Sequence, residues 1–480
     1  MCVSLKILAL LWAINFVPPL LTFFFEDQWN TPLDLGYRFP DGHPLLGSHK
    51  TFRGFLAGVG AGLLAGVLMG IPWWLGLGAG LLSMAGDLAS SFLKRRFGIS
   101  SGDIVPVLDQ GFEGLFPFFV LAPYYLLSIG ETLLLLVVFS LGAFIGSLFL
   151  NRVLLSLPFE NYPRLLRPRV RLKEFRSCQI TSEPLRYFLN FEDAFYYHVF
   201  MKTTLRLMGV YEKGKRNALQ LKTTKIDFYF STLPPSFENY TILFLSDLHL
   251  DGLDGLTERV QALVRRYPVD LCIFGGDLRM DHHGPFAEAL DRFFRLLPEI
   301  QAKDGIIAVL GNHDCLEMIE PLADAGLTVL LNDSQAIERN GEKIWIVGVD
   351  DPHYFKCHDL KLAFTGVPTG SFRIFLAHSN EIYREAAAYH PQLYLCGHTH
   401  GGQIQVPLLG PIFTHSSAPR SLFYGPWTYQ QMLGYTSCGV GVSGAPVRFS
   451  TQGEVLLITL RSDRDRSAPP ADDQRWVMRE

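Results

Sequence analysis

The sequence predicts two joined parts of different class: an N-terminal all-α transmembrane domain of about five helices and a C-terminal layered α/β domain. Long apolar stretches without charge occur only in the first 150 residues, as in Ile7–Phe25 and Gly54–Gly86, and their lengths match bilayer spans. From residue 240 onward, short apolar runs alternate with helix-like stretches, a pattern typical of sheets buried between helices. Five of these runs each lead into a polar block rich in His, Asp or Asn.

The first apolar stretch, Ile7–Phe25, is predicted to be a membrane span because it has no charged residue and is long enough to cross the hydrocarbon core. A cleaved signal peptide is the alternative. The length of the run, the Pro18-Pro19 pair inside it and the lack of a clear small-residue cleavage site favour the span.

The other two stretches are each predicted to form two spans. Gly54–Gly86 is too long for one helix of about 20 residues, and Gly70-Ile71-Pro72 is the expected break. Gly114–Leu150 contains a single charge, Glu131. Basic residues follow the third and fifth spans, so the positive-inside rule places the C-terminal domain in the cytoplasm. We therefore expect a multi-pass protein of the inner (plasma) membrane with the lipid bilayer as a partner.

The cysteine count and the net charge bound the function further. Seven cysteines are scattered without a CxxC pair, which disfavours a disulfide framework and favours a reducing compartment. The formal net charge is only −4, so no nucleic-acid partner is indicated.

Two loops of the membrane part contain more polar residues than an anchor needs. The first includes Lys50-Thr51-Phe52-Arg53, and the second runs from Asp87 through Lys94-Arg95-Arg96 to Asp109. Lys and Arg near a bilayer can hold phosphate groups, and aspartates can hold Mg²⁺ between them. Positive-inside charge and turn glycines explain the basic cluster but leave the aspartates unexplained.

Residues 30–150 resemble the CDP-archaeol synthase family, relatives of the phosphatidate cytidylyltransferases, which join CTP to a lipid phosphate and release pyrophosphate. The resemblance implies a site for CTP and Mg²⁺. Two positions depart from it: His49 replaces a small residue, and Phe112 stands where a second acid is usual, with Glu113 one place later. An active transferase and a retained scaffold therefore both stay open. The residues implied for this site are Lys50, Arg53, Asp87, Lys94, Arg95 and Asp109.

The last polar block, Cys396–Gln403, has two histidines separated by one residue between an apolar run and a glycine pair. A pair of surface histidines is the alternative for this block alone, but four similar blocks precede it. Sites in α/β folds gather at strand ends, so we expect the five blocks to converge. The earlier blocks are Ser246–His249, Gly275–Asp277, Gly311–Asp314 and Ala377–Ser379.

This ordered set resembles the calcineurin-like metallophosphoesterase family, in particular its membrane-associated branch whose last block reads GHTHGGQ. The resemblance implies an α/β metallophosphoesterase sandwich, two sheets flanked by helices, and hydrolysis of a phosphoester by two divalent ions. Mixed Asp, Asn and His ligands suit Mn, Fe or Zn. The implied ligands of the first ion are Asp247, His249, Asp277 and His400, and those of the second are Asp277, Asn312, His378 and His398, with Asp277 bridging.

The resemblance gives His313 a different role, which is to stabilise the phosphoryl group or to protonate the leaving oxygen. An acidic partner should orient it, and Asp281 and Asp314 are both candidates that the sequence does not separate. Among the histidines outside the blocks, His353 is the one expected to line the site.

We predict four segments: residues 1–157 as the CDP-archaeol synthase-like membrane domain, 158–222 as a connector, 223–462 as the phosphoesterase domain and 463–480 as a polar tail. In the connector, Glu183–Leu207 spaces its apolar residues by three and four, which predicts an amphipathic helix. That helix could lie on the bilayer or pack against the soluble domain.

A phosphoesterase for free nucleotides needs no membrane, so we predict a lipid-linked phosphoester, such as a CDP-lipid, as the substrate. An apolar rim beside the site is expected, and the same residues could instead fill the core. A bifunctional cytidylyltransferase and phosphoesterase, or a membrane scaffold or sensor, are the alternative functions. The expected rim residues are Phe413, Leu422, Phe423, Tyr424 and Trp427.

Overall fold

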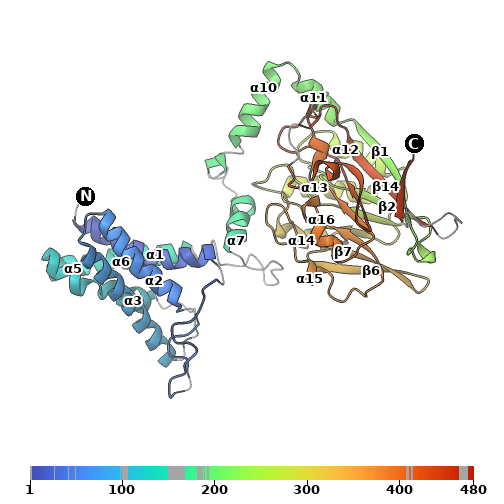
Figure 1. Ribbon diagram of the computed structural model, residues 1–480. Helices are drawn as coiled ribbons and strands as arrows, with labels where there is room; N and C mark the ends of the chain where they lie inside the picture. The colour runs from blue at the N-terminus through green and yellow to red at the C-terminus, as the bar shows by residue number, and fades with distance from the viewer. Residues whose placement is uncertain are drawn as a thin grey trace. The chain divides into compact units, whose positions relative to one another are not determined.

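The computed structural model describes residues 3–25, 28–41, 43–48, 50–97, 99, 106–149, 168–180, 187–188, 190–191, 194–406, 410–411, 415–463 and 474–479. They form two compact units. The first comprises residues 1–157 and 166–172, and the second comprises residues 158–165 and 173–480. All named strands belong to the second unit (Figure 1).

The first unit is helical, and three of its helices are long and apolar enough to cross a membrane: Val3–Leu21, Trp73–Arg96 and Ile129–Leu148. The predicted break at Gly70-Ile71-Pro72 separates α2 from α3. The short helix α5 lies where the fourth span was expected, from Gly114 onward, so the number of five spans stays a prediction. The helices are α1 (Val3–Phe25), α2 (Phe52–Leu68), α3 (Trp73–Arg96), α4 (Pro106–Leu115), α5 (Phe118–Tyr125) and α6 (Ile129–Phe149).

Glycines bring α2 and α3 into close contact. A Cβ atom on Gly62 would lie 2.6 Å from the carbonyl oxygen of Gly76, and one on Gly76 would lie 2.5 Å from that of Gly62. Small residues at such a crossing let two backbones approach, which favours helix association inside a bilayer.

Among the described residues, the second unit contains two large sheets packed face to face and a two-stranded sheet of β10 (Gln405–Val406) and β11 (Gly410–Pro411). The seven-stranded sheet has the order β15-β1-β14-β2-β3-β4-β5, and the six-stranded sheet has the order β12-β13-β9-β8-β7-β6. A fully buried cluster unites Phe228 and Phe244 of the first sheet with Ile346, Ile374 and Leu433 of the second. The predicted two-sheet α/β architecture is therefore confirmed.

The strands of the first sheet are β1 (Leu221–Phe230), β2 (Tyr240–Leu245), β3 (Leu271–Phe274), β4 (Ile306–Ala308), β5 (Leu327–Val329), β14 (Gly453–Ser462) and β15 (Gln474–Arg479). Those of the second are β6 (Asp333–Arg339), β7 (Glu342–Gly348), β8 (Phe372–Leu376), β9 (Leu393–Cys396), β12 (Gly425–Tyr429) and β13 (Met432–Thr436). Strands β2 to β5 run parallel, as do β7, β8, β9 and β13.

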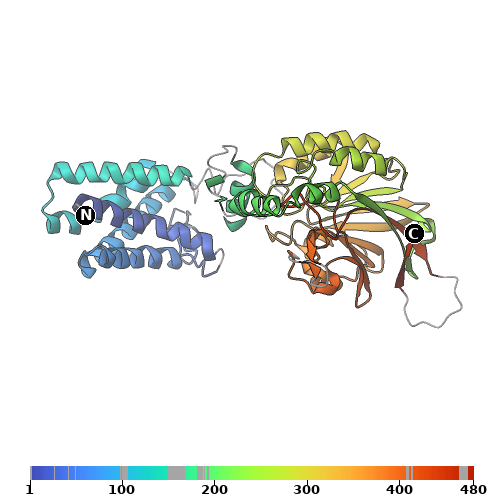
Figure 2. The same cartoon turned by 90° about the horizontal axis from the view of Figure 1, so that it is seen from above.

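Helices cover the outer faces of both sheets (Figures 1 and 2). Helices α12 (Leu256–Val264) and α13 (Ala287–Leu296) share a buried cluster with the seven-stranded sheet, and α14 (Ile319–Asp324) contributes to it. Helices α15 (Leu360–Ala363) and α16 (Tyr383–Ala387) do the same for the six-stranded sheet. This layering leaves the carboxyl ends of the parallel strands free to build a site.

The connector packs on the second unit through several short helices. Met201, Leu205 and Tyr211 join a buried cluster with Ala445 and Val447. The described part of the predicted amphipathic segment thus has one face against the soluble domain. These helices are η2 (Phe175–Gln179), η3 (Ala194–Met201), α10 (Lys202–Leu207) and α11 (Tyr211–Ala218), and α7 (Pro168–Glu174) precedes them.

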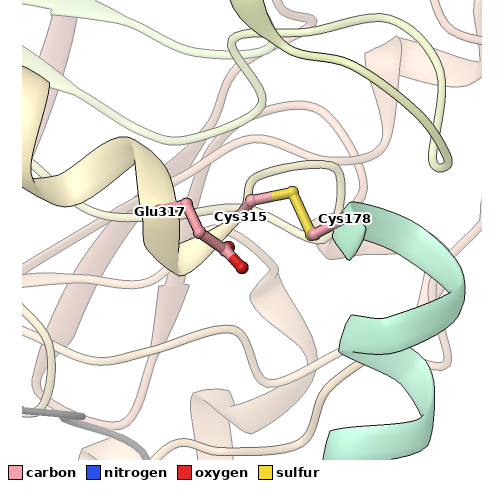
Figure 3. A group of neighbouring side chains, drawn as sticks. All are labelled: Cys178, Cys315 and Glu317. Carbon is pink, nitrogen blue, oxygen red and sulfur yellow. A yellow bond between two sulfur atoms is a disulfide. The ribbon is translucent and has the colours of Figure 1, made fainter. Parts of the chain in front are cut away.

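A disulfide joins Cys178 of η2 to Cys315, which follows the Gly311–Asp314 block (Figure 3). The expectation that the cysteine pattern disfavours disulfides was therefore wrong. An odd number of cysteines without CxxC does not exclude a pair separated by 137 residues. The compartment prediction now depends on the basic loops alone.

Candidate metal centre

The predicted ligands occupy loops that follow parallel strands of both sheets. Asp247 and His249 come after β2, and Asp277 comes after β3. Asn312 follows β4, His378 follows β8, and His398 and His400 follow β9. Because the two sheets share one core, the loops at their carboxyl ends meet at one edge.

Five of these residues have a left-handed backbone although none is glycine. Their φ angles are 52° for Asp247, 41° for His249, 61° for Asp277, 72° for His398 and 51° for His400. This conformation costs roughly 1–3 kcal/mol for each non-glycine residue and is concentrated at functional sites. The surrounding fold therefore holds these side chains in place against a local backbone preference.

The first group consists of Asp247, His249 and His400, whose candidate ligand atoms all lie within 4.8 Å of one another. Nε2 of His249 is 3.2 Å from Nε2 of His400, and the latter is 3.4 Å from Oδ1 of Asp247. All three residues are buried. Two imidazole nitrogens facing each other beside a carboxylate form a donor set that fits a divalent cation.

The second group consists of Asp277, His378 and His398, again within 4.8 Å. Oδ2 of Asp277 is 3.1 Å from Nε2 of His378 and 3.8 Å from Nε2 of His249, a member of the first group. Asp277 thus lies within reach of both groups. Oδ1 of Asn312 is buried without a hydrogen-bond donor among the residues described, which leaves it available to a cation.

Hydrogen bonds to backbone carbonyl oxygens orient the imidazoles. Nδ1 of His249 is 2.5 Å from the carbonyl oxygen of Arg279, and Nδ1 of His378 is 2.7 Å from that of Gly275. A ring nitrogen that donates to a carbonyl leaves the other nitrogen free to bind metal. In His398 the roles are exchanged, because Nε2 lies 2.8 Å from the carbonyl oxygen of His415.

Glycine is required beside the two aspartates. A Cβ atom on Gly397 would lie 2.2 Å from Oδ2 of Asp247, and one on Gly311 would lie 2.1 Å from Oδ1 of Asp277. The backbone N–H of His398 donates to Oδ1 of Asp247 at 2.9 Å. The glycines of the blocks therefore let the backbone come within hydrogen-bond distance of the carboxylates.

Burial and mutual charge shift the ionisation of the group. Burial raises the pKa of Asp277 to about 7 and lowers the pKa of His249 to about 3. Burial also lowers the pKa of His378, but the carboxylates of Asp277 and Asp247 outweigh this and raise it to about 10. Such opposed shifts in one buried cluster are typical of functional sites.

His313 lies at the edge of both groups. Its backbone N–H donates to Oδ1 of Asp277 at 2.8 Å, and its Nε2 is 3.8 Å from Oδ2 of the same residue. Its ring stacks on that of His282 at a centroid distance of 3.6 Å. The carboxylate of Asp314 accepts from the backbone N–H groups of Asp277, Leu278 and Gly311. It therefore connects the loop after β3 to the loop after β4.

Two buried arginines at the site belong to no motif and escaped the sequence reasoning. His282 was expected only as a surface or pocket-rim residue, and it lies beside His313. Arg279 donates to the carbonyl oxygens of His313 and His282, and Arg448 donates to those of Cys438 and His400. Both arginines therefore stabilise loops that contain candidate metal ligands. His353, expected to line the site, lies against His398 at a centroid distance of 4.1 Å.

The predicted apolar rim is wrong for Leu422 and Trp427. Both are buried in the core on the outer face of the six-stranded sheet, and Nε1 of Trp427 donates to Oγ1 of Thr436 at 2.9 Å. Phe423 is half-buried, Tyr424 is partly exposed and accepts from Nζ of Lys222 at 2.7 Å, and Phe413 lies outside the described residues.

In the first unit, the predicted CTP and Mg²⁺ residues are only partly brought together. Nζ of Lys50 contacts both carboxylate oxygens of Asp87, at 2.6 and 2.7 Å. A Cβ atom on Gly86, the residue before Asp87, would lie 3.0 Å from Cα of Glu113, so the backbone of this buried acid lies against that of α3. Arg53, Lys94 and Arg95 are buried, whereas His49 and the side chain of Asp109 lie outside the description.

Comparisons with known proteins match both parts. Residues 7–153 match the CarS-like family of CDP-archaeol synthase, and residues 240–402 match the calcineurin-like phosphoesterase family. The uncharacterized metallophosphoesterase YkuE of Bacillus subtilis is 30% identical over 253 residues, covering 50% of this chain and 86% of that relative. Phosphodiesterase YaeI of Escherichia coli is 30% identical over 238 residues, with 46% and 82% covered.

For the first unit, the CDP-archaeol synthase of Methanopyrus kandleri is 48% identical over 85 residues, which cover 16% of this chain. The matched segment is 49% of that relative, so this chain spans about half its length. The N-terminal unit is thus similar to CDP-archaeol synthases.

Proposed function

Because the chain belongs to the calcineurin-like metallophosphoesterase family, we propose that its second unit hydrolyses a phosphoester or pyrophosphate bond with two divalent ions. The observation that carries this proposal is the proximity of two buried ligand groups, Asp247–His249–His400 and Asp277–His378–His398. Asp277 is close to both. A carboxylate in that position can serve two ions at once.

The residues present fit such a pair of ions. The first would be held by Asp247, His249 and His400, the second by Asn312, His378 and His398, with Asp277 shared. When bound, two such ions supply an activated water and neutralise charge on the phosphoryl oxygens. Mn²⁺, Fe or Zn²⁺ suits this mixture of oxygen and nitrogen ligands.

His313 is the proposed catalytic side chain outside the ligand set. Its backbone is fixed by Asp277 and its ring by His282, so its imidazole is held beside both ligand groups. From there it can stabilise a phosphoryl oxygen or protonate the leaving oxygen. Nε2 of His313 lies 3.8 Å from Oδ2 of Asp277.

We propose that the substrate is lipid-linked and is met at the cytoplasmic membrane face. Three helices of the first unit are long and apolar enough to cross a bilayer, and that unit is similar to enzymes named for a lipid product. Joining a phosphoesterase to a membrane raises its effective concentration toward substrates in the same bilayer. A CDP-lipid is chemically suited because its pyrophosphate could reach both ions.

The test is hydrolysis by the purified full chain with Mn²⁺, comparing a micellar CDP-lipid or lipid phosphoester with its soluble headgroup analogue. We expect faster turnover of the micellar substrate and none in the Asp277→Asn variant. Equal rates on both substrates would overturn the lipid assignment, and activity that persists in Asp277→Asn would overturn the metal assignment.

A second activity in the first unit, transfer of a cytidylyl group from CTP to a lipid phosphate with Mg²⁺, is favoured by the Lys50–Asp87 pair and by the buried Glu113, whose backbone lies against Gly86. Full-length Asp277→Asn protein, incubated with labelled CTP, Mg²⁺ and a lipid phosphate, should bind CTP and form CDP-lipid. Lys50→Ala should weaken both. Absence of binding and product in the parent variant would leave a membrane scaffold as the role of this unit.

A further inference from the structure

A cavity of about 230 Å³ lies between helix η3 of the connector and the loop that contains His400. Tyr196, Tyr197 and Met201 form its connector side. Ile404 and Ala445 line it on the side of the phosphoesterase core, and His400 and His415 are also among its lining residues. The cavity therefore starts at a proposed metal ligand and extends beneath the connector.

The connector wall is packed in place. The ring of Tyr197 lies so close to Gly444 that a Cβ atom there would be 2.4 Å from Cδ1 of the tyrosine. Tyr196 contacts Tyr197 at a centroid distance of 5.0 Å. Met201 packs against the buried cluster that includes Ala445 and Val447. These contacts give the cavity a defined aromatic and aliphatic surface.

Gln403 is one of several polar residues in the lining, and its amide is already hydrogen-bonded within the fold. Its Nε2 donates to the carbonyl oxygens of Ser443 and Ala445 at 3.0 and 2.8 Å, and its Oε1 accepts from the backbone N–H of Ser443 at 2.9 Å. A nucleobase in the cavity would need hydrogen-bond partners on its edges, and an unpaired polar group is costly to bury. A hydrocarbon chain has no such need.

The outer side of the same helix is also apolar. Phe195, Val199 and Phe200 are each about half exposed, at 49%, 53% and 51%. Beyond η3, Leu207 and Met208 are exposed as well. An apolar helix surface of this kind suits contact with lipid, so a chain that leaves the cavity would meet further apolar surface.

We infer that this cavity binds the first carbon atoms of the lipid group attached to the scissile phosphate. The inference deepens the proposed function, since it assumes that the phosphate lies at the His400 side of the site. A volume of about 230 Å³ is below the roughly 300–1,000 Å³ of pockets that hold drug-sized ligands. The cavity therefore accommodates only a short segment of the lipid group. The connector selects substrates by the carbon group that is attached to the phosphate.

The test is binding of n-alkylphosphonates, from methyl to hexyl, to the Mn²⁺-loaded full chain by calorimetry, with titrations into detergent buffer as blanks. We expect the dissociation constant to fall by up to about fourfold for each added methylene until the cavity is full. Met201→Trp should remove this dependence by filling the cavity. Val199→Trp adds the same indole on the exposed side of the same helix and should preserve it.

Methylphosphonate is too short to reach the cavity, so equal affinity for it in all three proteins will show that the site is intact. Affinities independent of chain length in the parent protein, or a dependence that survives Met201→Trp, would overturn the inference. So would cytidine monophosphate binding that exceeds hexylphosphonate binding and is lost in Met201→Trp. Failure of the proposed function is a separate result: no Mn²⁺-dependent hydrolysis of any phosphoester.

Discussion

Asp277 is the residue on which both ligand groups depend, because its Oδ2 faces His378 at 3.1 Å and His249 at 3.8 Å. We predict that Asp277→Asn abolishes hydrolysis and lowers the metal content of the purified protein. Elemental analysis with an activity assay measures both. Asp333→Asn, an exposed position on β6, is the control. Two full metal equivalents with normal turnover in Asp277→Asn would refute the shared-ligand assignment.

His313 should behave differently from the ligands because it is proposed to act on the substrate. We predict that His313→Ala retains its metals but loses roughly 10²–10⁴-fold in turnover, as expected for a missing acid or phosphoryl-stabilising group. His390→Ala, at an exposed histidine outside the five blocks, should change neither quantity. Loss of metal in His313→Ala would make His313 a ligand instead.

The residues of the candidate metal centre could be selected from sequence because each belongs to a short block whose residue types and order are local information, and the structure places them close together. Arg279, Arg448 and His282 could not be predicted in this way. Their roles come from carbonyl oxygens and a ring that only the folded chain brings near them. The same holds for the left-handed backbone of Asp247 and His400, which residue type alone does not indicate.

At the scale of elements, the start of the connector is attached to the phosphoesterase unit near Glu174. Burial raises the pKa of Glu174 to about 9, and the charges of Glu317 and Asp350 add to this rise. The folded chain thus keeps this proton to a higher pH than the unfolded chain, whose ordinary value is 4.5. The stability it contributes is complete below about pH 4.5 and is lost as the pH rises toward 9.

We therefore predict that the melting temperature of the full chain falls between pH 5 and pH 9, and that Glu174→Gln reduces this slope. The amide keeps the shape of the neutral acid but cannot ionise. Differential scanning fluorimetry across this range, with Glu212→Gln on an outer face of α11 as a control, measures the slopes. Identical slopes in the parent protein and Glu174→Gln would contradict the prediction.

The Cys178–Cys315 disulfide is a second link between the connector and the phosphoesterase core. A bridge across 137 residues removes entropy from the unfolded chain, worth up to about 5 kcal/mol in the chain-entropy model. We predict that Cys178→Ser lowers the melting temperature and speeds proteolysis in the connector, and that a reductant does the same to the parent protein. Cys357→Ser, at a cysteine outside this disulfide, is the control. An unchanged melting temperature in Cys178→Ser would show that the bridge adds no stability.

Helices and strands could be predicted where a run of neighbouring residues, such as an apolar stretch or a Gly-Pro break, indicates them. The break between α2 and α3 lies at the Gly70-Ile71-Pro72 sequence, and five strands precede their polar blocks as expected. The apolar wall beside the site was expected from Leu422 and Trp427 but is formed by Tyr197 and its neighbours. Which aromatic residues face a cavity depends on long-range packing, and helical spacing does not determine it.

At the scale of the whole molecule, two features bear on which side of the membrane holds the phosphoesterase. The basic residues Lys94, Arg95 and Arg96 at the end of α3 and those at residues 164–176 favour the cytoplasm by the positive-inside rule. The Cys178–Cys315 disulfide favours an oxidising compartment, although intracellular proteins of hyperthermophiles are an exception. Charge near the span ends acts on insertion itself, so we give it more weight.

We therefore predict that a reporter fused after residue 222 reports the cytoplasm in cells. The paired measurement is alkylation of Cys178 and Cys315 in intact cells and after lysis under denaturing conditions, which shows whether the bridge forms in vivo. A cytoplasmic reporter with an intact bridge would mean that the fold protects the disulfide from cellular reductants. An extracytoplasmic reporter would refute the predicted sidedness, and the substrate of the metal centre would then have to be sought on the outer face, because a lipid-linked phosphoester reaches only the site that shares its leaflet.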